Sequence, residues 1–289
     1  MKHWILLSAL LGFCIGGWAQ GPQKIGLVAE SGVKPSIRQQ IWKNLLQPGT
    51  GQILKGEKYR FELALISDDE LDAPEKLDAY ALIVIPSGRA MMSPKMLDNL
   101  KIYLHQGGKL VREMNAVALV DVNDDGGLNQ PKNMKANVDR SKAYWQEVAG
   151  ALPESPALVR RIRFGGAHNP FARDLPAELA DLDFPFEITG AGSSAFLTCY
   201  YTLAGAQAVA EGELLRADIP KNSTTPIEGI HPVVTLKAYG AGYCVSLGLN
   251  MAKSLHKKNM WPSSLYLTFY KNLMDWALNG TTQQKRGAQ

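Results

Sequence analysis

Residues 80–114 read YALIVIPSGRAMMSPKMLDNLKIYLHQGGKLVREM, and this stretch decides the fold. It begins with an unbroken apolar run, as expected of a strand that is covered on both faces. Ser93 is placed as an N-cap with Pro94 at the first helical position, and Gly107 marks the end of the predicted helix. The inner face of that helix carries Leu97, Leu100 and Leu104. A second apolar run, KLVREM, follows, so the stretch predicts two parallel strands joined by a helix.

The residues before this stretch repeat the alternation of strand and helix. Residues 24–30 (KIGLVAE) and 59–67 (YRFELALIS) have the apolar, β-branched character of buried strands. Between them a helix is predicted by apolar residues at every fourth position, Ile37, Ile41 and Leu45. The sequence therefore predicts an α/β domain with a doubly wound, flavodoxin-like, mostly parallel sheet.

The rhythm changes after residue 115. A polar loop to about residue 139 and a helix over 140–152 are expected, followed by a stretch rich in proline and glycine. Four later segments have strand character, namely 193–203, 206–214, 231–240 and 242–250. The chain then closes with a predicted helix over 263–280, whose apolar face carries Phe269, Leu273 and Trp276. These features predict a β-rich C-terminal elaboration of the α/β domain.

The N-terminal residues MKHWILLSALLGFCIGGWAQ have the form of a signal peptide. A lysine precedes an apolar run, and Gly17 and Ala19 fit the small-residue positions of a cleavage site before Gln20. We therefore expect residues 1–19 to be removed and the protein to be exported to the periplasm or the cell exterior. The apolar run is too short for a comfortable membrane span, and an uncleaved anchor is the alternative.

The mature chain is expected to form one domain over residues 20–279, because no linker interrupts it, and residues 280–289 are expected to be a flexible tail. The formal net charge is +4, and the basic residues are scattered rather than gathered into a stripe. This pattern argues against nucleic acid as a partner, and no membrane association is expected after cleavage. Cys199 and Cys244 lie in apolar runs, where a disulfide and two buried thiols are both compatible with the sequence.

Residues 77–111 resemble a segment of a known protein family. This segment is similar to the strand, turn, helix, Gly-Gly, strand segment of class I glutamine amidotransferase-like domains. The resemblance extends further to the trimerisation domain of family 42 β-galactosidases, which carries an acidic, Asn-containing loop after this strand, as ALVDVNDDGG (118–127) does. It covers most of residues 24–279, with no glycosidase barrel attached. The resemblance implies a glutamine amidotransferase-like fold in a stand-alone domain.

In active members of that class, a Cys lies on the sharp turn after the Gly-Gly strand, and a later His with an acidic partner activates it. In this sequence the turn consists of Met114, Asn115, Ala116 and Val117. Cys199 and Cys244 are expected to lie away from this turn, and His231 is expected only to open a strand. The resemblance therefore implies that chemistry by the usual Cys triad is absent.

Ligands of open α/β sheets bind outside the carboxyl ends of the strands. At these ends Ser87, Gly88 and Arg89 are predicted to offer backbone N–H groups and a guanidinium to an anion or a sugar hydroxyl. Asn115 follows the next strand and is predicted to belong to the same ligand site. Two carboxylates at these ends, Glu30 and Glu113, are the candidates for acid–base catalysis, and a surface charge pair with Arg112 is the alternative for Glu113.

The acidic loop offers a candidate metal site. Asp121, Asn123 and Asp125 alternate ahead of Gly126, as in the first half of a calcium-binding loop. The twelfth position holds Lys132 instead of the expected bidentate Glu. A solvated acidic turn is the alternative, so no cofactor is expected other than this candidate calcium ion.

These observations lead to one main functional hypothesis and one alternative. The main hypothesis is an exported, non-catalytic glutamine amidotransferase-like domain that acts in assembly or ligand binding. Its expected partners are a second copy of the chain, another envelope protein or a saccharide, and the link to carbohydrate metabolism comes from the resemblance alone. The alternative is a hydrolase of a sugar or an amide that uses Glu30 and Glu113, or a metal ion, in place of a Cys triad.

Overall fold

The computed structural model describes residues 23–30, 42–43, 46, 61–120, 134–154, 157–165, 169–181, 197–218, 223–249 and 264–284. The strands are β1 (Gln23–Val28), β2 (Phe61–Ile66), β3 (Tyr80–Ile85), β4 (Met91–Met92), β5 (Lys109–Glu113), β6 (Leu119–Val120), β7 (Ala151–Pro153), β8 (Ala157–Arg163), β9 (Ala180–Asp181), β10 (Leu197–Thr198), β11 (Tyr201–Leu203), β12 (Gln207–Asp218), β13 (Ser223–Tyr239) and β14 (Gly242–Leu247). The helices are α2 (Asp68–Leu71), α3 (Pro74–Leu77), α4 (Pro94–His105), α5 (Met134–Val148) and α7 (Ser264–Gln284).

Five parallel strands form one half of the main sheet, in the spatial order β2-β1-β3-β5-β14. The predicted strands at the start of the chain are confirmed, and β14 joins them although it lies more than a hundred residues after β5 in the sequence. The prediction of an α/β fold with a large sheet is therefore confirmed. All five carboxyl ends lie at one edge of the sheet, which is the edge that carries the predicted site residues.

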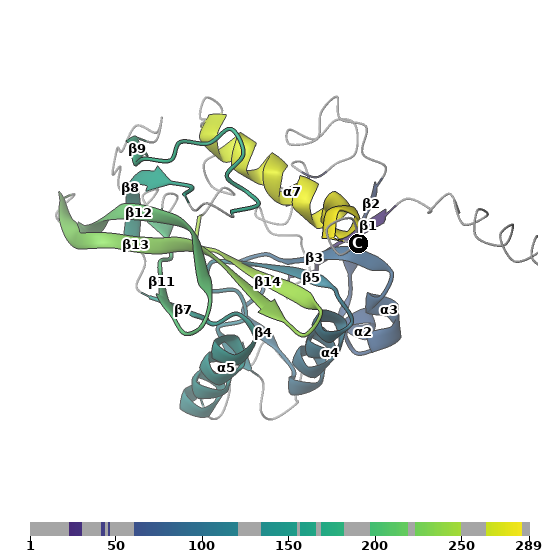
Figure 1. Cartoon of the computed structure of the whole chain (residues 1–289). Helices are drawn as coiled ribbons and strands as arrows, with labels where there is room; N and C mark the ends of the chain where they lie inside the picture. Colours follow the sequence, from purple (N-terminus) through teal and green to yellow (C-terminus); the bar gives the residue numbers. More distant parts are fainter. Residues whose placement is uncertain are drawn as a thin grey trace, which may run out of the picture.

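The β-rich second half extends this same sheet. Strand β13 pairs antiparallel with β14, then β12 pairs with β13 and β8 with β12, while β9 and β10 both pair with β8. The long hairpin of β12 and β13 reaches beyond β14 and projects from the body of the molecule (Figure 1). The predicted C-terminal elaboration is therefore continuous with the parallel strands through β14.

Strand β3 shows how the sheet separates two cores. Leu82 and Val84 pack into the core beneath α7, which also contains Trp42 and Leu46 from the helical segment between β1 and β2. Ile83 and Ile85 point to the other face, where α2, α3, α4 and α5 lie (Figure 1). Alternate side chains of one strand are thus buried on opposite faces, which explains why the whole run is apolar.

Helix α4 has the ends that the sequence predicts. The hydroxyl of Ser93 accepts a hydrogen bond of 3.2 Å from the Met96 amide, and Pro94 occupies the first turn. Gly107 has φ of +101° just after the helix, a conformation that glycine adopts without a steric penalty. The inner-face residues Leu97, Leu100 and Leu104 are buried.

Two elements begin earlier than the sequence predicts. Helix α5 starts at Met134 instead of residue 140. Its first turns are polar and mostly face solvent, although Asn137 is buried, so no apolar periodicity marks them in the sequence. Strand β13 starts at Ser223 instead of residue 231, because pairing with β12 keeps the proline-containing segment extended. His231 therefore lies inside this strand, and the expectation that it opens a strand is wrong.

Residues 1–19, which are expected to form a signal peptide, lie outside the described residues. Helix α7 runs to Gln284, so residues 280–284 of the expected flexible tail are helical, and residues 285–289 lie outside the described residues. Among the helices that the structure describes, none combines the length and the apolar character that a membrane span needs.

Candidate functional site

The turn after β5 carries two strained residues. Met114 has φ of 52° and Val117 has φ of 53°, and both are L-residues in the left-handed region. This conformation is uncommon for any side chain and especially unfavourable for a β-branched one such as Val117. Strain of this kind persists only where surrounding contacts enforce it, and it is concentrated at functional sites. The turn is therefore a candidate functional site.

Contacts on both sides of its peptide hold Met114 in place. Its amide donates to the carbonyl oxygen of Leu247 at the end of β14, at 2.7 Å. Its carbonyl oxygen accepts a hydrogen bond of 3.1 Å from the Tyr201 hydroxyl and two long ones of 3.4 Å from Arg112. The end of β5 is thus joined to β14 and β11.

Val117 is held in the same way. Its amide donates to the carbonyl oxygen of Arg89 at 2.6 Å. Its carbonyl oxygen accepts hydrogen bonds from the Ser141 hydroxyl at 2.6 Å and the Trp145 indole nitrogen at 3.1 Å, both on α5. Together these contacts fix a sharp turn at the carboxyl edge of the sheet.

The thiol of Cys199 lies against this turn. Cys199 and Met114 belong to one buried cluster with Ala151 and Tyr201, so the expectation that Cys199 lies away from the turn is wrong. Burial raises the pKa of the Cys199 thiol to about 11, although nearby Arg112 opposes this rise. Because the thiolate is the reactive form, Cys199 has the properties of a structural thiol and not those of a nucleophile.

Cys199 and Cys244 do not form a disulfide. Both thiols are free and buried. Cys244 lies on β14, and burial raises the pKa of its thiol to about 12. Two buried thiols, one of the two arrangements that the sequence left open, are therefore present.

The two candidate carboxylates lie at the same short turn, Ser87–Gly88, at the end of β3. The backbone amide of Ser87 donates to a carboxylate oxygen of Glu113 at 2.8 Å, and Glu113 is fully buried. The carboxyl group of Glu30 lies directly over Gly88, since a Cβ atom on that glycine would be only 2.1 Å from it. The structure thus brings Glu30 and Glu113 to one turn, although Glu30 follows β1 and Glu113 ends β5.

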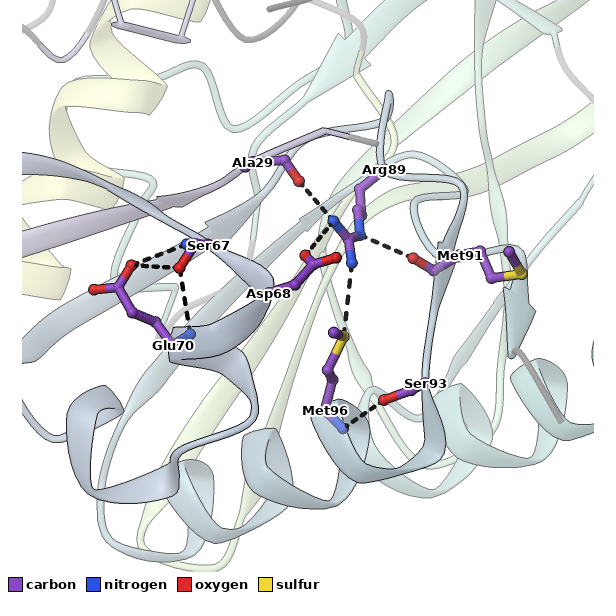
Figure 2. Close-up of polar contacts among 8 residues, drawn as sticks. All are labelled: Ala29, Ser67, Asp68, Glu70, Arg89, Met91, Ser93 and Met96. Atoms are coloured by element: carbon purple, nitrogen blue, oxygen red, sulfur yellow. Dashed lines mark hydrogen bonds and ion pairs between the residues drawn. The ribbon is translucent and has the colours of Figure 1, made fainter. Parts of the chain in front are cut away.

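The guanidinium of Arg89 is already engaged by the protein (Figure 2). It donates to the carbonyl oxygens of Met91 at 2.8 Å and Ala29 at 3.0 Å, and it forms an ion pair of 2.7 Å with Asp68. A further contact of 3.6 Å reaches the sulfur of Met96. Arg89 therefore ties the ends of β1 and β4 to α2 and α4, and its role in ligand binding stays a prediction.

Asn115 lies at a cavity of about 240 Å³ on the α5 side of the turn. The cavity is lined by the turn after β5, by α5, by β7 with Glu154, and by Cys199. Arg112 forms part of its wall. The predicted ligand residues thus divide, because Ser87 and Gly88 lie with the two carboxylates, while Asn115 lies with Arg112.

A larger cavity of about 390 Å³ lies at the opposite edge of the sheet, beside the amino ends of β1, β3 and β5. Lys109 lines it, and its ammonium donates to the carbonyl oxygen of Ala277 at 2.6 Å. Burial lowers the pKa of Lys109 to about 8. None of the predicted site residues lines this cavity.

The candidate calcium ligands Asp121, Asn123 and Asp125 lie outside the described residues. Within the part of the chain that the structure describes, no group of three or more His, Cys, Asp or Glu residues could hold a metal ion. The calcium site stays a prediction.

Sequence reasoning missed Arg112 as a site residue and considered it only as a surface partner of Glu113. In the structure Arg112 is fully buried. The available signal was its position, since a charged residue in the middle of a strand that is covered on both faces cannot reach solvent.

The fold is similar to those of several solved structures. A putative ThuA-like protein from Bacteroides uniformis aligns with a TM-score of 0.53 at 14% identity, covering 91% of this chain and 95% of that one. A β-galactosidase from Rahnella sp. R3 aligns with a TM-score of 0.51 at 14% identity, and one from Bacillus circulans with 0.50 at 12%. These alignments cover 88% and 90% of this chain, which spans 31% of each galactosidase.

At such low identity the similarities show the fold alone. The alignments with β-galactosidases are consistent with the resemblance found in the sequence. No protein-family model matches the chain, and no curated protein matches it.

Proposed function

We propose that this chain is an exported, non-catalytic glutamine amidotransferase-like domain that binds a ligand at the carboxyl edge of its parallel strands. The strand order β2-β1-β3-β5-β14 supports a doubly wound, flavodoxin-like assignment, because it is the order 2-1-3-4-5 when these strands are numbered along the chain. Helical residues on both faces of the sheet also support it.

One observation carries the non-catalytic part of the proposal. Met114 is one of the two strained residues at the turn after β5, where the family resemblance calls for a nucleophilic Cys. A thioether has no proton to lose and cannot form the covalent intermediate of that class. The neighbouring thiol of Cys199 does not replace it, because its raised pKa keeps it protonated near neutral pH.

The ligand and the partners are proposed on the similarities. The alignments with β-galactosidases support a role in carbohydrate metabolism, with a saccharide as the ligand. The resemblance to a trimerisation domain supports self-association or assembly with another envelope protein. The N-terminal sequence supports export to the periplasm or the cell exterior.

Thermal unfolding of residues 20–289 tests this proposal. The midpoint would be measured with mono- and oligosaccharides, with glutamine, and with calcium followed by a chelator, because a ligand of the folded state raises the midpoint. We expect a saccharide to raise it, and release of ammonia from glutamine to be absent. Steady release of ammonia would refute the non-catalytic assignment. A calcium response that Asp121→Ala abolishes would establish the predicted metal loop.

A second function is favoured by the pair of carboxylates. Glu30 and Glu113 both contact the Ser87–Gly88 turn, and Glu113 is fully buried while Glu30 is half-buried. Two carboxyl groups in different surroundings can serve as acid and base in hydrolysis. The structure is thus compatible with a hydrolase that needs no Cys triad.

Hydrolysis of nitrophenyl glycosides by the wild type and by Glu113→Gln distinguishes this second function. The exposed Glu62 on β2 supplies the control variant, Glu62→Gln. A hydrolase should lose at least about 100-fold in turnover with Glu113→Gln, and none with Glu62→Gln. The absence of turnover in the wild type, or equal turnover in both variants, would remove this function.

A further inference from the structure

The guanidinium of Arg112 is buried without an anionic partner among the described residues. Its side chain is fully buried, and none of the ion pairs in the described part of the chain includes it. Within the described part of the chain, Nε and Nη2 make only the two long hydrogen bonds to the Met114 carbonyl oxygen, and Nη1 has no hydrogen-bond partner there. A buried charge in this condition is costly, and proteins ordinarily compensate it with a counter-ion.

A cavity of about 240 Å³ lies beside Arg112. Arg112 forms part of its wall. The wall also contains Val117 of the turn after β5, Leu119 of β6, and Val138 and Trp145 of α5. These neighbours are apolar or aromatic. They suit an occupant with an organic body and a single charged group better than a fully hydrated inorganic anion.

Polar groups continue from Arg112 across the sheet. Arg112 on β5 pairs in register with Ser246 on β14, which pairs with Thr235 on β13. All three side chains are fully buried, and the hydroxyls of Ser246 and Thr235 have no hydrogen-bond partner among the described residues. A row of buried polar side chains without hydrogen-bond partners among the described residues is unusual in a core.

The charged residues at the cavity favour an anion. Lys142 on α5 lines the cavity and is exposed, so it adds a second positive charge nearer to solvent. Glu154 also lines it, but this carboxylate is exposed and is held by the hydroxyl of Thr202. The charge of Arg112 is buried, whereas that of Glu154 is exposed to solvent. The inner part of the cavity therefore has positive character.

We propose that this cavity binds a small organic carboxylate whose charge is neutralised by Arg112, with Asn115 at the same cavity offering amide hydrogen bonds. This inference rests on the proposed ligand-binding function and names the chemical class of the ligand. The free Nη1 supplies a charge-assisted hydrogen bond to a carboxylate oxygen, the strong kind of hydrogen bond in such sites. The apolar walls contact the remainder of the molecule.

Calorimetric titration with galacturonate, galactose and inorganic phosphate tests the proposal. The proteins compared are the wild type, Arg112→Met and Arg160→Met, since Arg160 is an exposed arginine on β8. Galacturonate should bind the wild type and Arg160→Met equally and bind Arg112→Met at least about tenfold more weakly. Galactose and phosphate should bind more weakly than galacturonate to the wild type.

The free proteins give a second readout. Because Met removes a buried, unpaired charge, Arg112→Met should unfold at the same or a higher temperature than the wild type without ligand. If Arg112→Met fails to fold, Arg112→Lys replaces it, and this variant should keep a preference for galacturonate over galactose with reduced affinity.

Two negative outcomes separate the inference from the function on which it rests. Equal binding of galacturonate and galactose by the wild type and Arg112→Met would overturn the inference and leave a saccharide-binding domain. No binding of any of the three probes by the wild type, at millimolar concentrations, would overturn both.

Discussion

The guanidinium carbon of Arg112 lies 4.3 Å from the centroid of the Trp145 ring. The contact joins the end of β5 to α5, and the same indole donates its N–H to the strained Val117. An aromatic face attracts a cation but does not neutralise it. The contact with Trp145 thus positions Arg112 beside the cavity and leaves its charge available to an anionic ligand.

Arg89 should be important for stability through the carbonyl groups that it satisfies. In Arg89→Lys the planar fork of guanidinium donors is lost, so at least one of the part-buried carbonyl oxygens of Ala29 and Met91 should lose its donor. We expect the free energy of unfolding to fall by about 2–4 kcal/mol. Denaturant unfolding measures this change.

Asp68→Asn is the matched control for Arg89→Lys, because it removes the ion pair and leaves the carbonyl contacts intact. The Asp68 carboxylate is largely exposed, so its loss should cost at most about 1 kcal/mol. Equal losses in the two variants would contradict the role given to the carbonyl groups.

Gly248 should tolerate no side chain. A Cβ atom there would lie 1.9 Å from the Cys199 carbonyl oxygen and 2.6 Å from that of Val233. Because both are backbone atoms held in the sheet, Gly248→Ala should destabilise the protein by about 1–3 kcal/mol or more. Gly165→Ala is the control, since its nearest neighbour would be at an ordinary 3.7 Å. A neutral Gly248→Ala in thermal unfolding would contradict this close approach.

Lys109 should make stability depend on pH. Its pKa is lowered from 10.5 to about 8 by burial, so between these values the unfolded chain holds a proton that the folded chain has lost. The contribution of Lys109 to the free energy of unfolding therefore rises with pH across this window. The difference between wild type and Lys109→Met, measured by urea unfolding from about pH 7 to 9, should increase with pH. A constant difference would contradict the lowered pKa.

The two thiols should be unreactive in the folded mature protein. With a pKa of about 11, roughly one Cys199 thiol in a thousand is ionised at about pH 8, and Cys244 is ionised still less. A thiol reagent should label both quickly in urea and neither quickly in buffer. Rapid labelling of one thiol in the folded protein would show that it is accessible, and failure to label in urea would reveal a disulfide.

The same thiols should lower stability at alkaline pH. Their folded pKa values lie above the usual 9.0, so above about pH 9 the unfolded chain loses protons that the folded chain keeps. This contribution to the free energy of unfolding therefore falls as pH rises, opposite in sign to that of Lys109. Cys199→Ala should weaken this alkaline decline in urea unfolding.

The parallel half of the sheet could be predicted because its signals are local. Ser93, Pro94 and Gly107 define the ends of α4 through their own backbone preferences, and the apolar run of β3 reports burial on both faces. The start of β13 could not be predicted, since the segment from Ser223 is extended only because β12 pairs with it.

The candidate site could be predicted only in part. The sequence placed Glu30, Ser87 and Glu113 at the carboxyl ends of strands that share an edge, and the structure brings them to one turn. Nothing in the sequence indicated that Cys199 would lie against Met114, because that contact depends on the approach of Cys199 to Gly248 at the end of β14.

The sequence by itself determined the early strands, the helix α4 between two of them and the absence of a Cys or Ser at the turn after β5. Periodicity, helix caps and residue identity are properties of short stretches, so they can be read without the fold. Only the tertiary structure decided that Arg112 would be buried beside a cavity without an anionic partner among the described residues. That outcome depends on α5, β7 and β14 packing around one strand, and such non-local contacts are set by the whole chain.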